Sequence, residues 1–321
     1  MKKILVTGGA GFIGSEFVRQ IARRGDTVMV LDALTYAGDK ARLSAVKGQV
    51  SFKKVDICNA SMVFKMVKNF RPDSIVHFAA ETHVDRSIKD GQVFLQTNIM
   101  GTQTMLEAAR LLGVARLVHI STDEVYGDVA RGSSAEDAPF RPNSPYSVSK
   151  AAADLLVSSY FRTYGLPVNI VRASNNYGPW QFPEKLIPVV IYKALHNLKV
   201  PVYARGLNVR EWLHVADCAR GIIAVMEKGA FGAAYNIGSG IHRRNIEVVK
   251  AVLQLTGRPG SLIEYVADRP GHDFRYSINC ARIQKELGWR PQVDLDTGLA
   301  ETVAWYKANQ GWLDRKTGQA R

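Results

Sequence analysis

The sequence contains few cysteines and no long apolar segment. Its three cysteines, Cys58, Cys218 and Cys280, are odd in number and widely separated, so they indicate neither a disulfide framework nor a zinc motif. No apolar run is long enough to span a bilayer, and the start, Met1–Val6, resembles a signal peptide for only a few residues before the chain enters a glycine-rich turn. We therefore expect a cytoplasmic protein in a reducing compartment, with no metal site and no membrane partner.

Acidic residues are scarce as well. The chain has 29 Asp and Glu against 42 Lys and Arg, which gives a formal net charge of +13. A basic protein can bind nucleic acid by releasing counterions from the phosphates. Here the basic residues are scattered in short pairs, and no recognition-helix, zinc-finger or RNA-binding signature accompanies them. We expect no nucleic-acid partner and prefer an anionic small-molecule substrate.

The first half of the chain alternates β-rich runs with longer helical patterns, which is typical of a parallel sheet covered on both faces. The expected strands are Lys3–Thr7, Thr27–Leu31, Val50–Lys54, Ser74–Phe78, Leu117–Ser121 and Val168–Arg172. The expected helices are Ser15–Arg23, Ala60–Lys68, Gln96–Leu112 and Ser147–Tyr164. The pattern predicts an α/β fold, a doubly wound (Rossmann) parallel sheet with ligands at the carboxyl ends of its strands.

The alternation ends after Arg172, where prolines punctuate the loops around further helices. These helices are expected at Ile187–Leu198, Ile246–Thr256, Ala281–Leu287 and Leu295–Gln310. We expect a first, dinucleotide-binding domain over residues 1–171 and a smaller C-terminal α/β substrate domain over residues 172–321. The segment of about 212–237 is expected to return to the first domain, and residues 316–321 are expected to fray.

A glycine-rich turn follows the first strand and opens a helix. Within Gly8–Gly14, the spacing Gly-x-Gly-x-x-Gly fits the dinucleotide fingerprint. Glycine permits a tight turn and a close approach of pyrophosphate to the helix N-terminus. Asp32, at the end of the second strand, can bind the two ribose hydroxyls and would repel a 2′-phosphate, which favours NAD over NADP. Asp56 and Ile57, at the next strand end, could hold adenine, although a helix N-cap beside a core isoleucine explains them equally well.

Two further motifs indicate acid–base chemistry. Tyr146 and Lys150 are spaced to lie one turn apart on one face of a helix. There the lysine ammonium can lower the pKa of the phenol, so that the tyrosine can take a proton from an alcohol. Asp123 and Glu124 follow Thr122 at a strand end and could supply an additional acid and base, although carboxylates also cap helices. An alcohol oxidation coupled to an elimination needs all of these groups, which points to a sugar dehydratase.

With these motifs, the chain resembles the extended short-chain dehydrogenase/reductase family and, within it, the dTDP-glucose 4,6-dehydratases. The resemblance covers nearly the whole chain. It includes Thr35–Gly38, Ala79–Ser87, Ser174–Pro179, Phe182–Pro188 and Asp268–Asp273. It implies a lyase of deoxysugar biosynthesis that keeps NAD bound, acts on a nucleotide-diphospho-glucose, and pairs as a homodimer through Gln96–Leu112 and Ser147–Tyr164.

The resemblance also implies roles for individual residues. Tyr146 would remove the proton of the sugar 4-hydroxyl, Glu124 the proton on C5, and Asp123 would protonate the departing 6-hydroxyl. The expected catalytic residues are Thr122, Asp123, Glu124, Tyr146 and Lys150. The expected cofactor-binding residues are Gly8, Gly11, Phe12, Ile13, Gly14, Asp32, Asp56, Ile57, Phe78, Ala79, Ala80, Thr97, Tyr146, Lys150 and Asn175. The expected substrate-binding residues are His83, Thr122, Asn175, Lys185, Leu186, Pro201, Tyr203, Arg210, Asn245, Arg269 and His272.

Other functions stay open at this point. The loop between Tyr126 and Tyr146 is short for the family, and Gly206–Trp212 departs from its usual motif, so the base of the nucleotide, thymine or uracil, is undecided. The same reaction on UDP-glucose is the nearest alternative, followed by a nucleotide-sugar 4-epimerase. A non-catalytic protein that senses NAD is the alternative from another class. Such a sensor would need neither the carboxylate pair nor the tyrosine.

Overall fold

Seven parallel strands form the central sheet of this computed structural model, which describes residues 1–319. From one edge to the other they are β10 (Ala234–Ile237), β6 (Val168–Ala173), β5 (Arg116–Thr122), β4 (Ser74–His77), β1 (Lys3–Thr7), β2 (Thr27–Asp32) and β3 (Val50–Lys54). The direction of winding reverses between β1 and β4, and the carboxyl ends of the strands at such a point form a crevice. The predicted doubly wound fold is confirmed.

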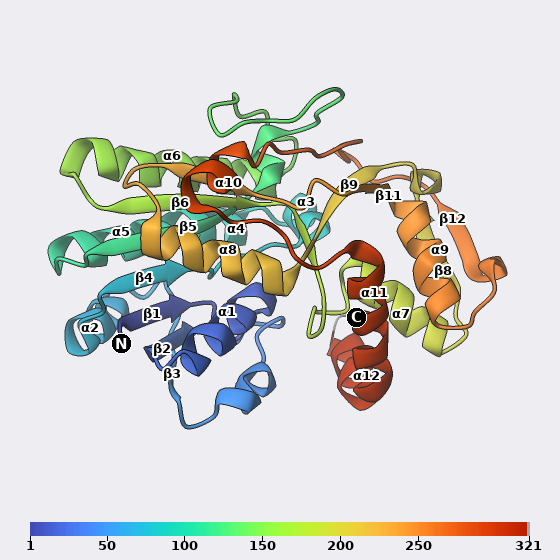
Figure 1. Cartoon of the computed structure of the whole chain (residues 1–321), viewed down its shortest axis with the longest axis horizontal. Coiled ribbons are helices and arrows are strands. Elements are labelled where there is room, and N and C mark those ends of the chain that lie inside the picture. The colour runs from blue at the N-terminus through green and yellow to red at the C-terminus, as the bar shows by residue number, and fades with distance from the viewer. Residues whose placement is uncertain (320–321) are drawn as a thin grey trace.

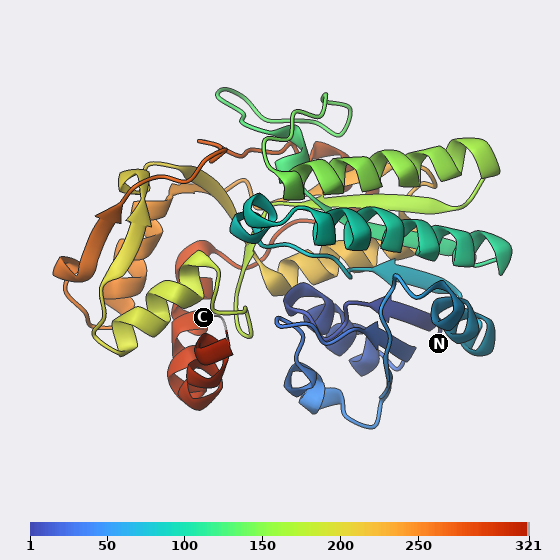
Figure 2. The same ribbon diagram turned by 180° about the vertical axis from the view of Figure 1, so that it is seen from behind.

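Helices cover both faces of this sheet (Figures 1 and 2). One face carries α2 (Ala60–Phe70), α5 (Thr102–Leu111) and α6 (Pro145–Tyr164), and the other carries α1 (Phe12–Arg23), α8 (Val215–Lys228) and α10 (Ala281–Leu287). Strand β1 shows why the strand sequences are apolar throughout: Ile4 and Val6 enter the core on one face, and Leu5 enters the core on the other. A strand buried on both faces has no polar side to alternate with.

Shorter helical segments complete this part of the molecule. They are η1 (Lys40–Val46), α3 (Val84–Lys89), α4 (Gln92–Leu95), η2 (Gln96–Gly101) and η3 (Asp123–Tyr126). The single helix expected over Gln96–Leu112 is wrong in its first part, because Gln96–Gly101 forms a π-helical turn that continues into α5. A side chain at Gly101 would lie 2.5 Å from the Ile57 side chain, so the backbone packs closely there. Hydrophobic periodicity does not reveal such a local widening of a helix.

The remaining elements build a second core beside the sheet (Figure 1). Its helices are α7 (Leu186–Leu195), α9 (Asn245–Leu255), α11 (Leu295–Ala308) and α12 (Gln310–Gln319), with short turns η4 (Ala204–Gly206) and η5 (Gly260–Leu262). Its strands are β7 (Asn175–Tyr177), β9 (Val209–His214) and β11 (His242–Arg244) in one sheet, and β8 (Val200–Tyr203) and β12 (Ile263–Val266) in another. Among residues 1–319, no helix is both long enough and apolar enough to cross a membrane.

The chain passes between the two parts more than once. Helix α8 and strand β10 lie within the segment that was expected to return to the sheet, although the exact domain limits stay a prediction. A later segment also joins the sheet's core through Cys280, Ile283 and Trp289, which the sequence did not indicate. The expected fraying is wrong for residues 316–319, which belong to α12, where the Lys316 ammonium lies 3.2 Å from the Asp39 carboxylate. Residues 320–321 lie outside the described part.

Candidate active site

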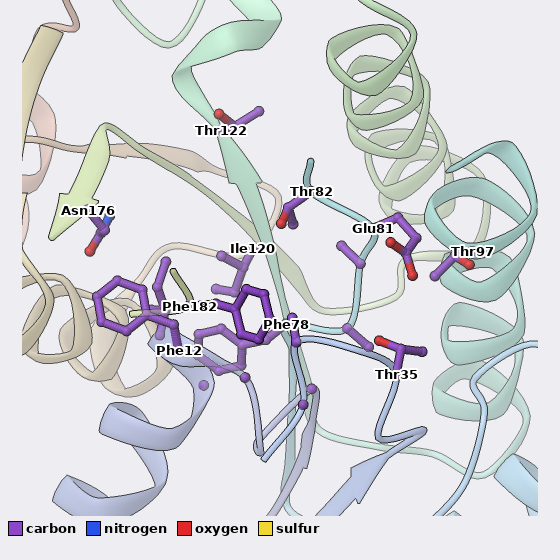
Figure 3. A pocket seen from close by; sticks show the side chains of 18 of the residues that line it. Phe12, Thr35, Phe78, Glu81, Thr82, Thr97, Ile120, Thr122, Asn176 and Phe182 are labelled. Carbon is purple, nitrogen blue, oxygen red and sulfur yellow. The ribbon is translucent and has the colours of Figure 1, made fainter. Parts of the chain in front are cut away.

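A cavity of about 340 Å³ opens at the carboxyl ends of the central strands. Every residue that was expected to bind the cofactor or to act in catalysis lines it. Figure 3 shows the rings of Phe12, Phe78 and Phe182 gathered near Ile120, with the polar side chain of Thr122 beyond them. The cavity therefore combines apolar surfaces, suited to planar rings, with polar groups at one end.

The glycine turn lines the cavity and packs so tightly against neighbouring backbone that its glycines leave no room for side chains. Gly8 has φ +66°, and a Cβ on it would lie 2.6 Å from the backbone nitrogen of Ala79. A Cβ on Gly14 would lie 2.3 Å from the carbonyl oxygen of Gly8. The first turn of α1 follows directly, and its free N–H groups form a site for a phosphate. This turn fits the pyrophosphate of a dinucleotide.

Asp32 ends β2 as a buried carboxylate at the cavity wall. Its Oδ2 accepts a hydrogen bond from the backbone nitrogen of Ala10 at 2.9 Å, and its Oδ1 accepts one from that of Leu34 at 2.8 Å. Burial raises the pKa of Asp32 above its usual value. Each oxygen keeps a second lone pair, so the carboxylate fits two ribose hydroxyls. These observations show that the residues present fit NAD.

The alternative for Asp56 and Ile57 can be compared with the geometry. Helix α2 is capped by Asn59, whose side chain accepts a hydrogen bond from the backbone nitrogen of Met62. Asp56 instead accepts one from the backbone nitrogen of Cys58 at 2.9 Å. Both Asp56 and Ile57 line the cavity. The structure thus gives the capping role to another residue, but Ile57 does belong to the hydrophobic core of the sheet. Adenine binding by this pair stays a prediction.

Tyr146 and Lys150 extend from α6 into the same cavity, and both side chains are buried. The Lys150 ammonium donates to the carbonyl oxygen of Ile120 at 2.7 Å and lies 3.4 Å from His119 Nε2. Burial raises the pKa of Tyr146 well above its usual value, and the carboxylates of Glu124 and Asp123 raise it further, while the hydroxyl of Thr122 lowers it. The lowering by lysine expected from the sequence therefore does not dominate in this structure.

The carboxylates of Asp123 and Glu124 have different environments. Asp123 is buried, and both burial and the neighbouring charges of Glu124 and Glu211 raise its pKa well above the usual value. Burial also raises the pKa of Glu124, but Lys185, Arg210 and Arg269 oppose that rise, and Ser147 donates a hydrogen bond to it at 3.1 Å.

Neither carboxylate of this pair serves as the cap of η3. That role belongs to Thr122, whose hydroxyl accepts a hydrogen bond from the backbone nitrogen of Glu124 at 3.3 Å. The explanation of the pair as helix caps therefore lacks support. Two carboxyl groups held in different environments are the arrangement by which a site can keep one protonated and the other ionised.

The expected substrate residues fall into two groups. Thr122, Asn175 and Lys185 line the cavity. The others lie outside the cavity lining, and they are His83, Leu186, Pro201, Tyr203, Arg210, Asn245, Arg269 and His272. Arg210 and Arg269 nevertheless lie close enough to Glu124 to act on its pKa.

Several of the outer residues have side-chain partners within the protein. Arg210 donates to the carbonyl oxygens of Val209, Asp273 and Phe274, and His272 Nδ1 lies 2.6 Å from Asp268 Oδ1. His83 caps α3 by accepting a hydrogen bond from the backbone nitrogen of Arg86, and its Nε2 lies 3.6 Å from Glu184. Arg269 forms an ion pair with Asp85 at 2.8 Å, which joins the loop before residue 273 to α3. A nucleotide-sugar at this edge would have to compete with that pair.

Sequence reasoning missed several residues of the cavity. Glu81, Thr82, Asn176, Phe182 and Glu184 line it, and four of them appear beside the expected residues in Figure 3. All lie within the segments that carried the family resemblance, which was the available signal. Arg42 also lines the cavity; its buried guanidinium donates to the carbonyl oxygens of Ala10, Ala37 and Trp180. No motif marked that residue.

The reversed winding, the glycine turn, Asp32 and the Tyr146–Lys150 pair together define an NAD-binding protein of the extended short-chain dehydrogenase/reductase type. Comparison with known proteins narrows this class. The family model described as GDP-mannose 4,6 dehydratase matches residues 5–302, and the chain belongs to this family.

The similar proteins include dehydratases and epimerases of nucleotide-sugars. A dTDP-glucose 4,6-dehydratase of Streptomyces griseus is 52% identical over 317 residues, which cover 97% of this chain and 96% of that protein. The crystal structure of DesIV, the dTDP-glucose 4,6-dehydratase of Streptomyces venezuelae, with NAD and TYD bound, has a TM-score of 0.96 and 49% identity, covering 98% and 99% of the two chains. A UDP-glucose 4-epimerase of Thermus thermophilus in complex with NAD has a TM-score of 0.89 and 34% identity, covering 95% and 99%.

Proposed function

We propose that this chain is an NAD-dependent dTDP-glucose 4,6-dehydratase, a hydro-lyase that converts a nucleotide-bound glucose into a 4-keto-6-deoxy sugar. The observation that carries the proposal is the carboxylate pair Asp123 and Glu124 in the cavity that also holds Tyr146 and Lys150. Oxidation of an alcohol needs one base, whereas loss of water needs a further base and an acid. The dehydratases that match nearly the whole chain support the thymidine nucleotide.

The first step is the removal of the proton from the sugar 4-hydroxyl by Tyr146. Thr122 hydrogen-bonds the 4-oxygen in this scheme, which is supported by its closeness to the phenol, whose pKa it lowers. Lys150 contributes its positive charge from the next turn of α6 and one hydrogen-bond donor to the cofactor ribose. NAD, when bound, accepts the hydride from C4 and later returns it to C6.

Elimination follows because a ketone at C4 acidifies the proton on C5. Glu124 is the base: three cations oppose the rise of its pKa, which favours the ionised form. Asp123 is the acid: burial and the charge of Glu124 favour its protonated form. It donates its proton to the departing 6-hydroxyl, and water leaves. This division of roles follows from the two environments.

The nucleotide-sugar is held by the expected substrate residues. Asn175 and Lys185 reach it from the cavity wall, and Arg210 and Arg269 hold its diphosphate through forked hydrogen bonds. Arg269 exchanges Asp85 for the phosphate when the substrate arrives. The positive charges that face Glu124 thus serve two purposes, because they attract the anionic substrate and keep the catalytic base ionised.

The protein acts as a homodimer in the cytoplasm. Large apolar side chains lie exposed on η2, α5 and α6, where a pair of helices from each subunit would meet, and these are Met100, Leu111, Val148, Leu155, Phe161 and Tyr164. Such a surface supports a subunit interface. The cysteines Cys58, Cys218 and Cys280 are free, which suits a reducing compartment.

The proposal is tested by incubating the purified protein with dTDP-glucose or UDP-glucose, without added NAD, and following product mass. Loss of one water from dTDP-glucose is expected, and faster loss from UDP-glucose would correct the nucleotide. A product of unchanged mass that is an isomer at C4 would show an epimerase instead. An epimerase would have no use for the carboxylate pair, so this outcome would also remove the roles given to Asp123 and Glu124.

A further inference from the structure

A buried charge lies behind the catalytic pair on the same face of α6. Asp154 follows Lys150 by the interval at which Lys150 follows Tyr146, so the three side chains form one row along the helix. Asp154 is 0% exposed and Lys150 is 3% exposed. At about 1.5 Å per residue, the aspartate is attached roughly 6 Å further along the helix than the lysine. A fully buried carboxylate is costly unless a partner stabilises it.

Only one of the two oxygens of the Asp154 carboxylate takes part in an ion pair with Arg172. Asp154 Oδ2 accepts a hydrogen bond from Arg172 Nε at 2.8 Å, and Arg172 also donates to the Tyr126 hydroxyl at 2.7 Å. Asp154 Oδ1 has no hydrogen-bond partner among residues 1–319, and it lies 3.7 Å from His119 Nε2. The free oxygen of the aspartate therefore faces His119 of β5.

His119 connects this oxygen to the lysine. Its ring is 1% exposed, and the same Nε2 atom lies 3.4 Å from the Lys150 ammonium nitrogen. Its Nδ1 finds no hydrogen-bond partner in the described chain. Nε2 faces both groups. In one neutral tautomer it accepts a hydrogen bond from the ammonium of Lys150, and in the other its N–H is directed at Asp154. A proton that moves between Lys150 and this carboxylate would pass through that one atom.

We propose that Asp154 is a positioning residue for catalysis, whose buried charge, acting beside His119, keeps Lys150 protonated and its ammonium fixed beside Tyr146. The inference deepens the proposed function, because it rests on the role given there to Lys150. A lysine in a dry pocket tends to lose its proton, and a neutral amine would no longer stabilise the phenolate of Tyr146. Asp154 offsets that tendency from the side of the lysine that the substrate does not reach.

The other groups around Lys150 do not supply this charge. Burial lowers the pKa of Lys150 to about 8, and Asp154 opposes that fall. From β4 and β5, burial lowers the pKa of His77 to about 3 and that of His119 well below its usual value, so both rings are neutral near pH 7. In the protein without bound cofactor, Tyr146 on α6 supplies no negative charge to the lysine either, because burial raises the pKa of its phenol.

Three further ionisable groups lie nearby. Arg172 of β6 is committed to Asp154, and its own cationic charge would favour loss of the lysine's proton. Asp123 and Glu124 of η3 act on Tyr146, in the direction that disfavours its phenolate. Among these groups, Asp154 is thus the one whose negative charge favours the protonated form of Lys150.

The test is the substitution Asp154→Asn, read by two measurements. An opposite charge at about 4–6 Å moves a pKa by roughly 1–3 units, so the alkaline limb of the kcat/KM profile should move to lower pH by about one unit or more. KM for the nucleotide-sugar should change little. Independently of activity, NMR of carbon-13-labelled lysine ε-carbons should show the Lys150 signal, identified by its loss in Lys150→Met, titrating at correspondingly lower pH.

Two controls keep the result decisive. Asp137→Asn removes an exposed carboxylate in the loop before α6 and should leave both readouts at their wild-type values. Asp154→Asn combined with Arg172→Gln replaces the buried ion pair by two amides that can hydrogen-bond, so it can fold even if the single variant does not. If Lys150 titrates at its wild-type pH in Asp154→Asn, or no lower in the double variant than in Arg172→Gln alone, the proposal is wrong. If wild type shows no dehydratase activity while the NMR shift is present, the proposed function fails and the coupling stands.

Discussion

Asp123→Asn is the substitution that separates catalysis from stability most clearly. It preserves the size of the side chain and can still pair with the Thr122 hydroxyl, which lies 3.3 Å from Asp123 Oδ1. It removes the acid that protonates the departing 6-hydroxyl. A positioned general acid contributes about 10²–10⁴ in rate, or roughly 3–5 kcal/mol of barrier. Asp123 is only 2% exposed, so water cannot easily replace it, and we expect a loss in the upper half of that range.

The same substitution should increase stability. Burial raises the pKa of Asp123 in the folded state well above its usual 3.8. The folded protein therefore holds a proton that the unfolded chain releases, and wild-type stability falls as the pH rises from about 4 toward the folded pKa. Asparagine carries no such penalty. The variant should unfold at higher urea concentration than wild type at pH 7, and the difference should vanish below about pH 4.

The assay follows reduced cofactor and product in parallel. Because Tyr146 and Lys150 are intact, the variant should still oxidise C4, so absorbance of the reduced cofactor should build up after substrate is added while product forms slowly. Asp137→Asn, an exposed carboxylate in the next loop, is the matched control and should behave as wild type. Product formation at the wild-type rate in Asp123→Asn would refute the assignment of the general acid.

Further substitutions test other parts of the structure. Tyr146→Phe should reduce kcat by at least about 10³, with no reduced cofactor formed, because the proton of the 4-hydroxyl has no acceptor; an undiminished rate would remove the tyrosine from the mechanism. Gly8→Ala places a methyl group 2.6 Å from the backbone of Ala79, so the purified protein should retain less NAD, as read by absorbance after gel filtration, and equal retention would contradict the described turn. Trp312→Ala should cost about 3–5 kcal/mol in urea unfolding, because its buried ring packs on Trp180 and its Nε1 donates to Asp39 at 2.8 Å; a loss below about 1 kcal/mol would mean that α12 is not docked as described. Leu155→Lys should shift the dimer toward monomer in light scattering, since Leu155 is 63% exposed on α6, and an unchanged mass would place the interface elsewhere.

Much of the fold could be predicted because the strands of a parallel sheet are apolar on both sides. Runs such as Ile4–Val6 and Val28–Leu31 stand out between glycine turns and helices, and the structure places them in the centre of the sheet. The local pattern Gly8–Gly14 followed by Asp32 also has one physical interpretation, since a turn this tight and a carboxylate at the next strand end suit a dinucleotide. These features depend on neighbours in the sequence.

What could not be predicted depends on contacts between distant segments. The path of Arg42 to the carbonyl oxygens of Ala10 and Trp180 joins three loops and leaves no local pattern. The π-helical turn at Gln96–Gly101 packs closely against Ile57, which is distant in the sequence. The raised pKa of Tyr146 depends on burial in the folded chain, so sequence spacing to Lys150 indicated the pair but not its electrostatics. The row Tyr146, Lys150 and Asp154 on α6 can be read from the sequence. Its contacts with His119 of β5 and Arg172 of β6 are known only from the folded structure.

The most direct test of the central claim has two parts. In the first, dTDP-glucose deuterated at C4 reacts in ordinary water; in the second, unlabelled dTDP-glucose reacts in heavy water. The proposed steps predict that the label leaves C4 and appears at C6 of the 4-keto-6-deoxy product. In heavy water, unlabelled substrate should gain deuterium at C5, because Glu124 exchanges its proton with solvent before C5 is reprotonated. Mass spectrometry and NMR of the product would read both positions. Label that returns to C4 in an isomer of unchanged composition would contradict the dehydratase and identify an epimerase.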